Sequence, residues 1–102
     1  MIAVVFLRGK GWIADMPLKA QPGLDGHVDW VHEHRDRQRG PIIEAGPFHD
    51  PRKTVRDELV GLALLDLDSL AAARTFVETD PVVATGAFAF KLYEWGGAPL
   101  RR

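Results

Sequence analysis

The step from Asp80 to Pro81 is the first place in this sequence where chemistry could be located. It follows an alanine-rich stretch that predicts a helix over Ser69–Glu78, and it precedes a predicted strand over Ala87–Trp95. A carboxylate held between two packed elements could orient or exchange a proton. Aspartate before proline is also an ordinary helix stop, because proline lacks an amide donor and disfavours helical geometry in the residue before it. These residues alone leave both interpretations open.

Three of the four histidines, His27, His32 and His34, fall in a predicted helix over Asp25–Arg39. At about 100° per residue, His27 and His34 share a face and His32 points elsewhere. One metal ion cannot join His27 to His34, because seven helical residues separate them by about 10 Å along the axis, whereas a Zn–N bond is about 2 Å. No metal site is therefore expected. Charged neighbours favour a solvated position for His32 and His34.

Four further residues could contact a small-molecule ligand. Gly46 and Pro47 form a predicted turn whose backbone N–H groups could face a ligand. Arg8, at the end of the first predicted strand, could bind a carboxylate or phenolate, and Trp12 could close over an apolar substrate. Arg8 could equally be a charge in water, and Trp12 an anchor for its loop. The sequence contains no phosphate-binding glycine loop, nucleophile elbow or dinucleotide fingerprint, so no organic cofactor is expected.

The elements that must position these residues follow the order β-α-β-β-α-β. Loops are predicted over residues 10–24, where a lid could form, and over 49–56. This order in 102 residues predicts one domain over residues 1–102 with an α+β, ferredoxin-like fold, a four-stranded antiparallel sheet with both helices on one face. The predicted strands are Ile2–Arg8, a short strand of Ile42–Ile43 and Ala45–Pro47 that ends in a turn at Gly46 and Pro47, Leu59–Asp66 and Ala87–Trp95. The predicted helices are Asp25–Arg39, stopped by Gly40 and Pro41, and Ser69–Glu78, capped by Asp68 or Ser69.

Both faces of the predicted strands are apolar. In the last strand Phe88, Phe90 and Leu92 alternate with Ala89 and Tyr93, and only Lys91 interrupts the second face. A two-layer monomer would leave one of these faces in water, which is unusual for a soluble monomer. We therefore expect a two-fold homodimer packed sheet to sheet.

Composition excludes several classes of function. The formal net charge of -1 provides no basic field for nucleic acid, so no nucleic-acid partner is expected. The absence of cysteine excludes disulfides and thiolate chemistry. The apolar run near the N-terminus is too short for a membrane span and lacks the basic start of a signal peptide, so a cytoplasmic location without membrane contact is expected.

Three segments, in this order, resemble the YciI-like (YCII-related) family of the dimeric α/β-barrel superfamily. They are residues 27–31 (HVDWV), residues 40–47 ending in Ala-Gly-Pro, and residues 68–95, which contain the Asp-Pro step and end in Tyr-Glu-Trp. The resemblance implies a dimeric α/β barrel with a cleft in each protomer. It also implies that His27 and Asp80 form a dyad. In such a pair the carboxylate accepts one imidazole N–H and fixes the tautomer, which leaves the other nitrogen free to exchange a proton.

The same resemblance implies a cofactor-independent lyase or isomerase that acts on a small hydroxylated aromatic or other carbon acid, with His27 as general acid and base. The alternative is a binding or accessory module that uses the same cleft without turning its ligand over. A third hypothesis is haem chemistry, as elsewhere in the superfamily, with His27 or His34 as the axial ligand.

Overall fold

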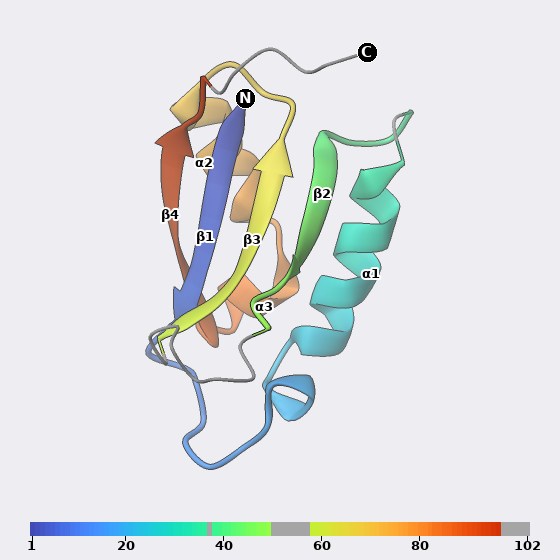
Figure 1. The fold of residues 1–102 in the computed structure, drawn as a ribbon. Coiled ribbons are helices and arrows are strands. Elements are labelled where there is room, and N and C mark those ends of the chain that lie inside the picture. The colour runs from blue at the N-terminus through green and yellow to red at the C-terminus, as the bar shows by residue number, and fades with distance from the viewer. Residues whose placement is uncertain (37, 50–57, 97–102) are drawn as a thin grey trace.

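The computed structural model describes residues 1–36, 38–49 and 58–96. Its strands form one antiparallel sheet in the order β2-β3-β1-β4. Helices α2 and α3 lie behind the sheet and α1 lies alongside β2 (Figure 1). The predicted ferredoxin-like α+β arrangement is confirmed. The elements are β1 (Ile2–Arg8), the 3-10 turn η1 (Leu18–Ala20), α1 (Leu24–Arg35), β2 (Ile42–Pro47), β3 (Leu59–Leu65), α2 (Leu70–Val77), α3 (Pro81–Ala84) and β4 (Phe88–Glu94).

The core lies between the helices and one face of the sheet. Ile2, Val4 and Phe6 are buried on this face of the central strand β1. Val4 lies opposite Ala63 on β3 and Leu92 on β4, so the apolar side chains of three strands meet in one layer. The alternation of buried and half-buried residues along β1 follows directly from the two-residue period of a strand.

The other face of the sheet is also apolar. Val5 lies opposite Leu62 on β3 and Lys91 on β4. The Leu62 side chain is 37% exposed and Tyr93, two residues beyond Lys91, is 52% exposed. The second apolar face predicted from the sequence is therefore present and in contact with solvent in a single chain.

Helix α1 ends at Arg35, so the prediction that it continues to Arg39 is wrong. Asp36 is in an extended conformation, and its carbonyl accepts hydrogen bonds from both Arg39 and Gly40. The chain thereby turns back across the end of the helix. Gly40 passes so close to His34 that an added Cβ would lie 2.7 Å from the His34 Cα, which explains the glycine at this position.

Strand β2 covers the predicted residues, but the turn predicted at Gly46 and Pro47 is wrong, because both residues are paired within the strand. Ala45, Gly46 and Pro47 lie opposite residues 63, 62 and 61 of β3. β2 is an edge strand, where a proline without an amide donor and a glycine without a side chain are both tolerated. The turn prediction treated these residue types as breakers and missed this edge position.

The remaining boundaries agree with the predictions to within a few residues. Ser69 caps α2 as expected, because its hydroxyl accepts the Ala72 N–H at 3.0 Å.

The loop predicted over 49–56 lies outside the described residues except for His49. Among the described residues, no helix combines the length and the apolar character needed to cross a membrane.

Removing Leu65 should test the buried face of the sheet. Leu65 is 0% exposed, so we expect Leu65→Ala to lower the free energy of unfolding by about 2–5 kcal/mol through lost burial and a residual cavity. Leu70→Ala is the control, because Leu70 is 41% exposed at the start of α2. Its effect should stay within about 0.5 kcal/mol. Urea denaturation would measure both, and equal losses would contradict this placement of the core.

Candidate functional site

The site is built around a hydrogen bond between His27 and Asp80, which are 53 residues apart in the sequence. The His27 Nδ1 lies 2.6 Å from the Asp80 Oδ2. The Asp80 side chain is fully buried and the His27 side chain is 15% exposed. An ionised carboxylate can only accept hydrogen bonds, so the imidazole donates from Nδ1 and its neutral form carries a lone pair on Nε2.

Asp80 is held by the start of α3, which the sequence did not predict. Its Oδ1 accepts the Val82 N–H at 3.1 Å, and Pro81 occupies the first turn of the helix. Proline is well suited to this position because its missing N–H is not needed there. The prediction that Pro81 stops the preceding helix is therefore wrong, since α2 has already ended at Val77. The Asp-Pro step starts a helix.

His27 is placed by the first turn of α1. The helix begins at Leu24 after Gly23, which has a φ of 86° and replaces the predicted cap Asp25. Gly26 packs against α3 so tightly that a Cβ there would lie 2.8 Å from the Pro81 Cβ. The two glycines thus allow α1 to approach the helix that carries Asp80.

Aromatic rings surround the His27 imidazole. Phe6 and Phe88 present edge contacts with ring centroids at 5.5 and 5.4 Å, and Trp30 stacks at 6.0 Å. The Trp30 indole N–H donates to the Thr79 hydroxyl at 2.9 Å, next to Asp80 in sequence. These contacts fix the plane of the imidazole, so its orientation does not depend on the hydrogen bond alone.

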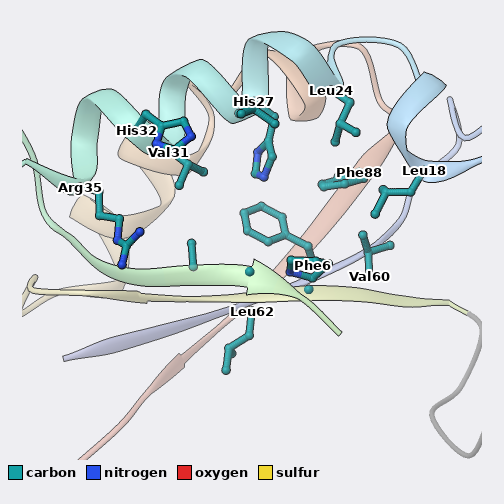
Figure 2. A pocket seen from close by; sticks show the side chains of 15 residues that line it. Phe6, Leu18, Leu24, His27, Val31, His32, Arg35, Val60, Leu62 and Phe88 are labelled. Carbon is teal, nitrogen blue, oxygen red and sulfur yellow. The ribbon is translucent and has the colours of Figure 1, made fainter. Parts of the chain in front are cut away.

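The imidazole points from α1 into a cavity of about 360 Å³ between α1 and the sheet (Figure 2). Most of the wall is apolar, with Phe6 and Phe88 on the sheet side. Gly46 and Pro47, predicted from the sequence as ligand contacts, also line it. The cavity gives a small apolar molecule direct access to the free edge of the imidazole.

Arg8 and Trp12 are not brought into this cavity. They line a neighbouring hollow, which shares Leu18 and Val60 with it. The Arg8 guanidinium lies 4.7 Å from the Trp12 ring centroid, and Trp12 in turn stacks on Phe88 at 6.4 Å. Trp12 therefore supports one wall of the cavity from behind.

Of the other two helix histidines, His32 is exposed as expected, whereas His34 is not. The His34 Nδ1 lies 2.8 Å from the Trp30 carbonyl oxygen, and its ring meets Phe76 at 5.0 Å, so it is partly buried instead of solvated. His32 is exposed but lines the cavity. Among the described residues, His27 is the histidine that contacts Asp80.

Sequence reasoning also missed Gln21, which is 3% exposed. Its amide N–H groups donate to the carbonyls of Ile13 and Met16, both at 2.9 Å, and its oxygen accepts the Ile13 N–H at 2.8 Å. These bonds hold the loop predicted as a possible lid, so Leu18 forms a fixed part of the cavity wall. No local pattern distinguishes such a glutamine from a solvated one.

Comparison with known proteins identifies the family and the fold. A family model of the YCII-related domain matches residues 12–95. No curated protein matches the sequence. Among solved structures, 5-chloro-2-hydroxyhydroquinone dehydrochlorinase from Burkholderia phenoliruptrix AC1100, in complex with 2,5-dihydroxybenzoquinone, is similar, with a TM-score of 0.60, 19% sequence identity and 96% of each chain covered. At this level of identity the likeness shows the shared fold.

Comparing the helix caps Ser69 and Asp80 separates the contribution of the Asp80–His27 hydrogen bond to stability from that of the cap. Ser69→Ala removes one cap bond at the start of α2 and should cost about 1 kcal/mol of unfolding free energy. Asp80→Ala removes a comparable cap bond and also leaves the His27 N–H without its acceptor, so it should cost about 3 kcal/mol. Urea denaturation of both variants measures the difference. Equal costs would show that the bond to His27 contributes nothing to stability.

Proposed function

Because the chain belongs to the YCII-related family, we propose that it is a small-molecule enzyme of lyase or isomerase type. In this proposal His27 is the general acid and base, and Asp80 orients it. The observation that carries the proposal is the 2.6 Å contact between the buried carboxylate and the Nδ1 of an imidazole that faces the cavity. Few structural roles would require a histidine to be held in one tautomer at the wall of a cavity.

The proposed chemistry is a proton transfer at Nε2. The lone pair on Nε2 takes a proton from a carbon or hydroxyl group of the bound substrate, and the imidazolium that forms is stabilised by the Asp80 carboxylate. The same proton then returns to another substrate atom or to a leaving group. The sequence is complete without a covalent intermediate.

The walls of the cavity favour a small hydroxylated aromatic substrate. Phe6 and Phe88 offer aromatic surfaces beside His27. Gly46 and Pro47 also line the cavity, and a planar ring could lie against them. A solved enzyme of the same fold, described as a dehydrochlorinase, is in complex with 2,5-dihydroxybenzoquinone. We assign Arg8 and Trp12 a secondary role in the adjoining hollow, where the guanidinium would attract an anionic substrate before it enters.

We also propose that two chains pair through the open face of the sheet. This face carries Val5, Leu62 and the exposed ring of Tyr93, and the Leu62 side chain projects to the side of the sheet opposite His27 (Figure 2). Pairing of two such faces would remove apolar area from water on both chains. It would leave the cavities on the outer faces of the sheets, open to ligands.

The catalytic proposal is tested by substituting the two residues of the pair. Phenols, catechols and small keto acids are screened for an increase in melting temperature, and mixtures with each hit are analysed for product. For a compound that is turned over, His27→Ala should lower kcat by about 100-fold or more, and Asp80→Asn by at least about tenfold. The control His49→Gln, at an exposed histidine outside the cavity, should change kcat less than twofold.

Unchanged turnover in His27→Ala and Asp80→Asn would contradict the assignment of His27 and Asp80 as the catalytic pair. Stabilisation by ligands without any product would instead favour the alternative, a binding module.

The proposed dimer is tested with a charge on each of two exposed leucines. Leu62→Lys places an ammonium on the open face and should convert the dimer into a monomer, because an unpaired charge is costly to bury. Leu70→Lys adds the same charge to α2, away from this face, and should leave the dimer intact. Sedimentation velocity measures the mass of each. A wild-type monomer at micromolar concentration, or a Leu62→Lys dimer, would contradict the proposal.

A further inference from the structure

The titratable side chains that line the His27 cavity are all basic. Its titratable residues, among the parts of the chain that are described, are His27, His32 and Arg35. No aspartate or glutamate of the described chain lines it, since Asp80 is fully buried behind the imidazole. A cavity with basic groups and no acidic ones selects for ligands that accept hydrogen bonds or carry negative charge.

The three basic residues that line the cavity all belong to α1. His27, Val31 and Arg35 are spaced four residues apart, and His32 lies next to Arg35 at i+3, so all four meet the cavity. The eight residues from His27 to Arg35 span about 12 Å along the helix axis. Arg35 lies at the end of the cavity beside β2, away from Leu24 and Phe88 (Figure 2). The two ends of the cavity therefore present different chemistry.

Arg35 forms an ion pair with Glu44 that leaves its guanidinium able to bind a ligand. Its Nη2 donates to the Glu44 Oε2 at 2.9 Å, and the two side chains are 47% and 60% exposed. An ion pair this exposed contributes little free energy, so a competing carboxylate can join or replace it. The guanidinium also has N–H donors beyond the one that bonds Glu44. Glu44 itself lines a different hollow, together with Leu64 and Phe48.

The geometry points to an anion subsite at the Arg35 end, formed by Arg35 with His32. The substrate is then a molecule with an apolar ring near His27 and an arm that ends in a carboxylate held by Arg35. This inference rests on the proposed function, because it takes His27 as the place where the ring binds. The separation of about 12 Å along α1 favours a carboxylate on an arm over one attached directly to the ring.

Three probes test the charge and the length separately. They are phenol, 3-(4-hydroxyphenyl)propanoate and the neutral amide of the same length, 3-(4-hydroxyphenyl)propanamide. Calorimetric titration gives each Kd, and the ¹⁵N shifts of the His27 ring show whether the ligand reaches the imidazole. We expect the propanoate to bind about five- to tenfold more tightly than the amide, as a charge-assisted but partly exposed contact would give.

Substitutions assign this preference to Arg35. In Arg35→Gln the propanoate should lose its advantage while the amide binds as before, and Arg35→Lys, which keeps the charge, should retain part of it. Arg39→Gln is the matched control, because Arg39 pairs with Asp36 just beyond the helix and does not line the cavity. That variant should keep the full preference. Glu44→Gln should strengthen propanoate binding about two- to threefold by removing the competing carboxylate.

The outcomes separate the two proposals. A preference for the propanoate that survives Arg35→Gln, with His27 shifts intact, would overturn the anion subsite and leave the proposed function standing. Binding of all three probes without any shift at His27 would count against the proposed function and the subsite together. Loss of the preference in Arg35→Gln, with unchanged phenol binding and His27 shifts, would support the subsite.

Discussion

The buried carboxylate of Asp80 is the constraint on which the rest of the site depends. A fully buried charge is costly unless hydrogen-bond donors surround it. This chain supplies the Val82 N–H from within α3 and the imidazole of His27 from α1. One donor is local and the other lies 53 residues away, so the carboxylate is satisfied only when the two helices are packed together. Assembly of the pair therefore requires the packing of α1 against α3.

The close approach of the helices explains residues that have no chemistry of their own. Gly26 leaves room for Pro81, and Gly23 adopts a left-handed conformation that starts α1 at the right point. The Thr85 hydroxyl donates to the Pro22 carbonyl at 2.7 Å and ties α3 to the chain just before α1. Each of these contacts reduces the freedom of the helix that carries His27. The imidazole is oriented before any ligand arrives, which is the condition for efficient proton transfer.

The sequence was sufficient for the order of the elements and for the central strand, because apolar alternation in residues 2–8 is a local signal. It was insufficient for Gly46 and Pro47, where only the edge position of β2 makes glycine and proline acceptable in a strand. The short helix α3 was missed for a related reason, since Asp-Pro is compatible with both the end and the start of a helix. In each case the same residues are compatible with two local structures, and the tertiary context determines which one forms.

The site residues divide in the same way. Asp80 was a candidate from its position before Pro81, but its pairing with His27 came from family resemblance, and the sequence by itself left His32 and His34 open. Gln21 and Arg35 had no signal at all, because a polar side chain reveals its role only through the backbone or cavity that it meets in space.

The two faces of the sheet separate two requirements that would otherwise conflict. The helix-covered face leaves open volume beside His27, and volume without packed side chains lowers stability. The loop fixed by Gln21 and the stacked rings of Trp30 and Phe76, with centroids 4.7 Å apart, restore rigidity around that volume. The open face lies away from His27 and presents mainly apolar side chains, among them Val5, Leu62 and Tyr93. Association through that face would stiffen the strands beneath the cavity without occupying it, so the same sheet can serve as interface and as the floor of a site.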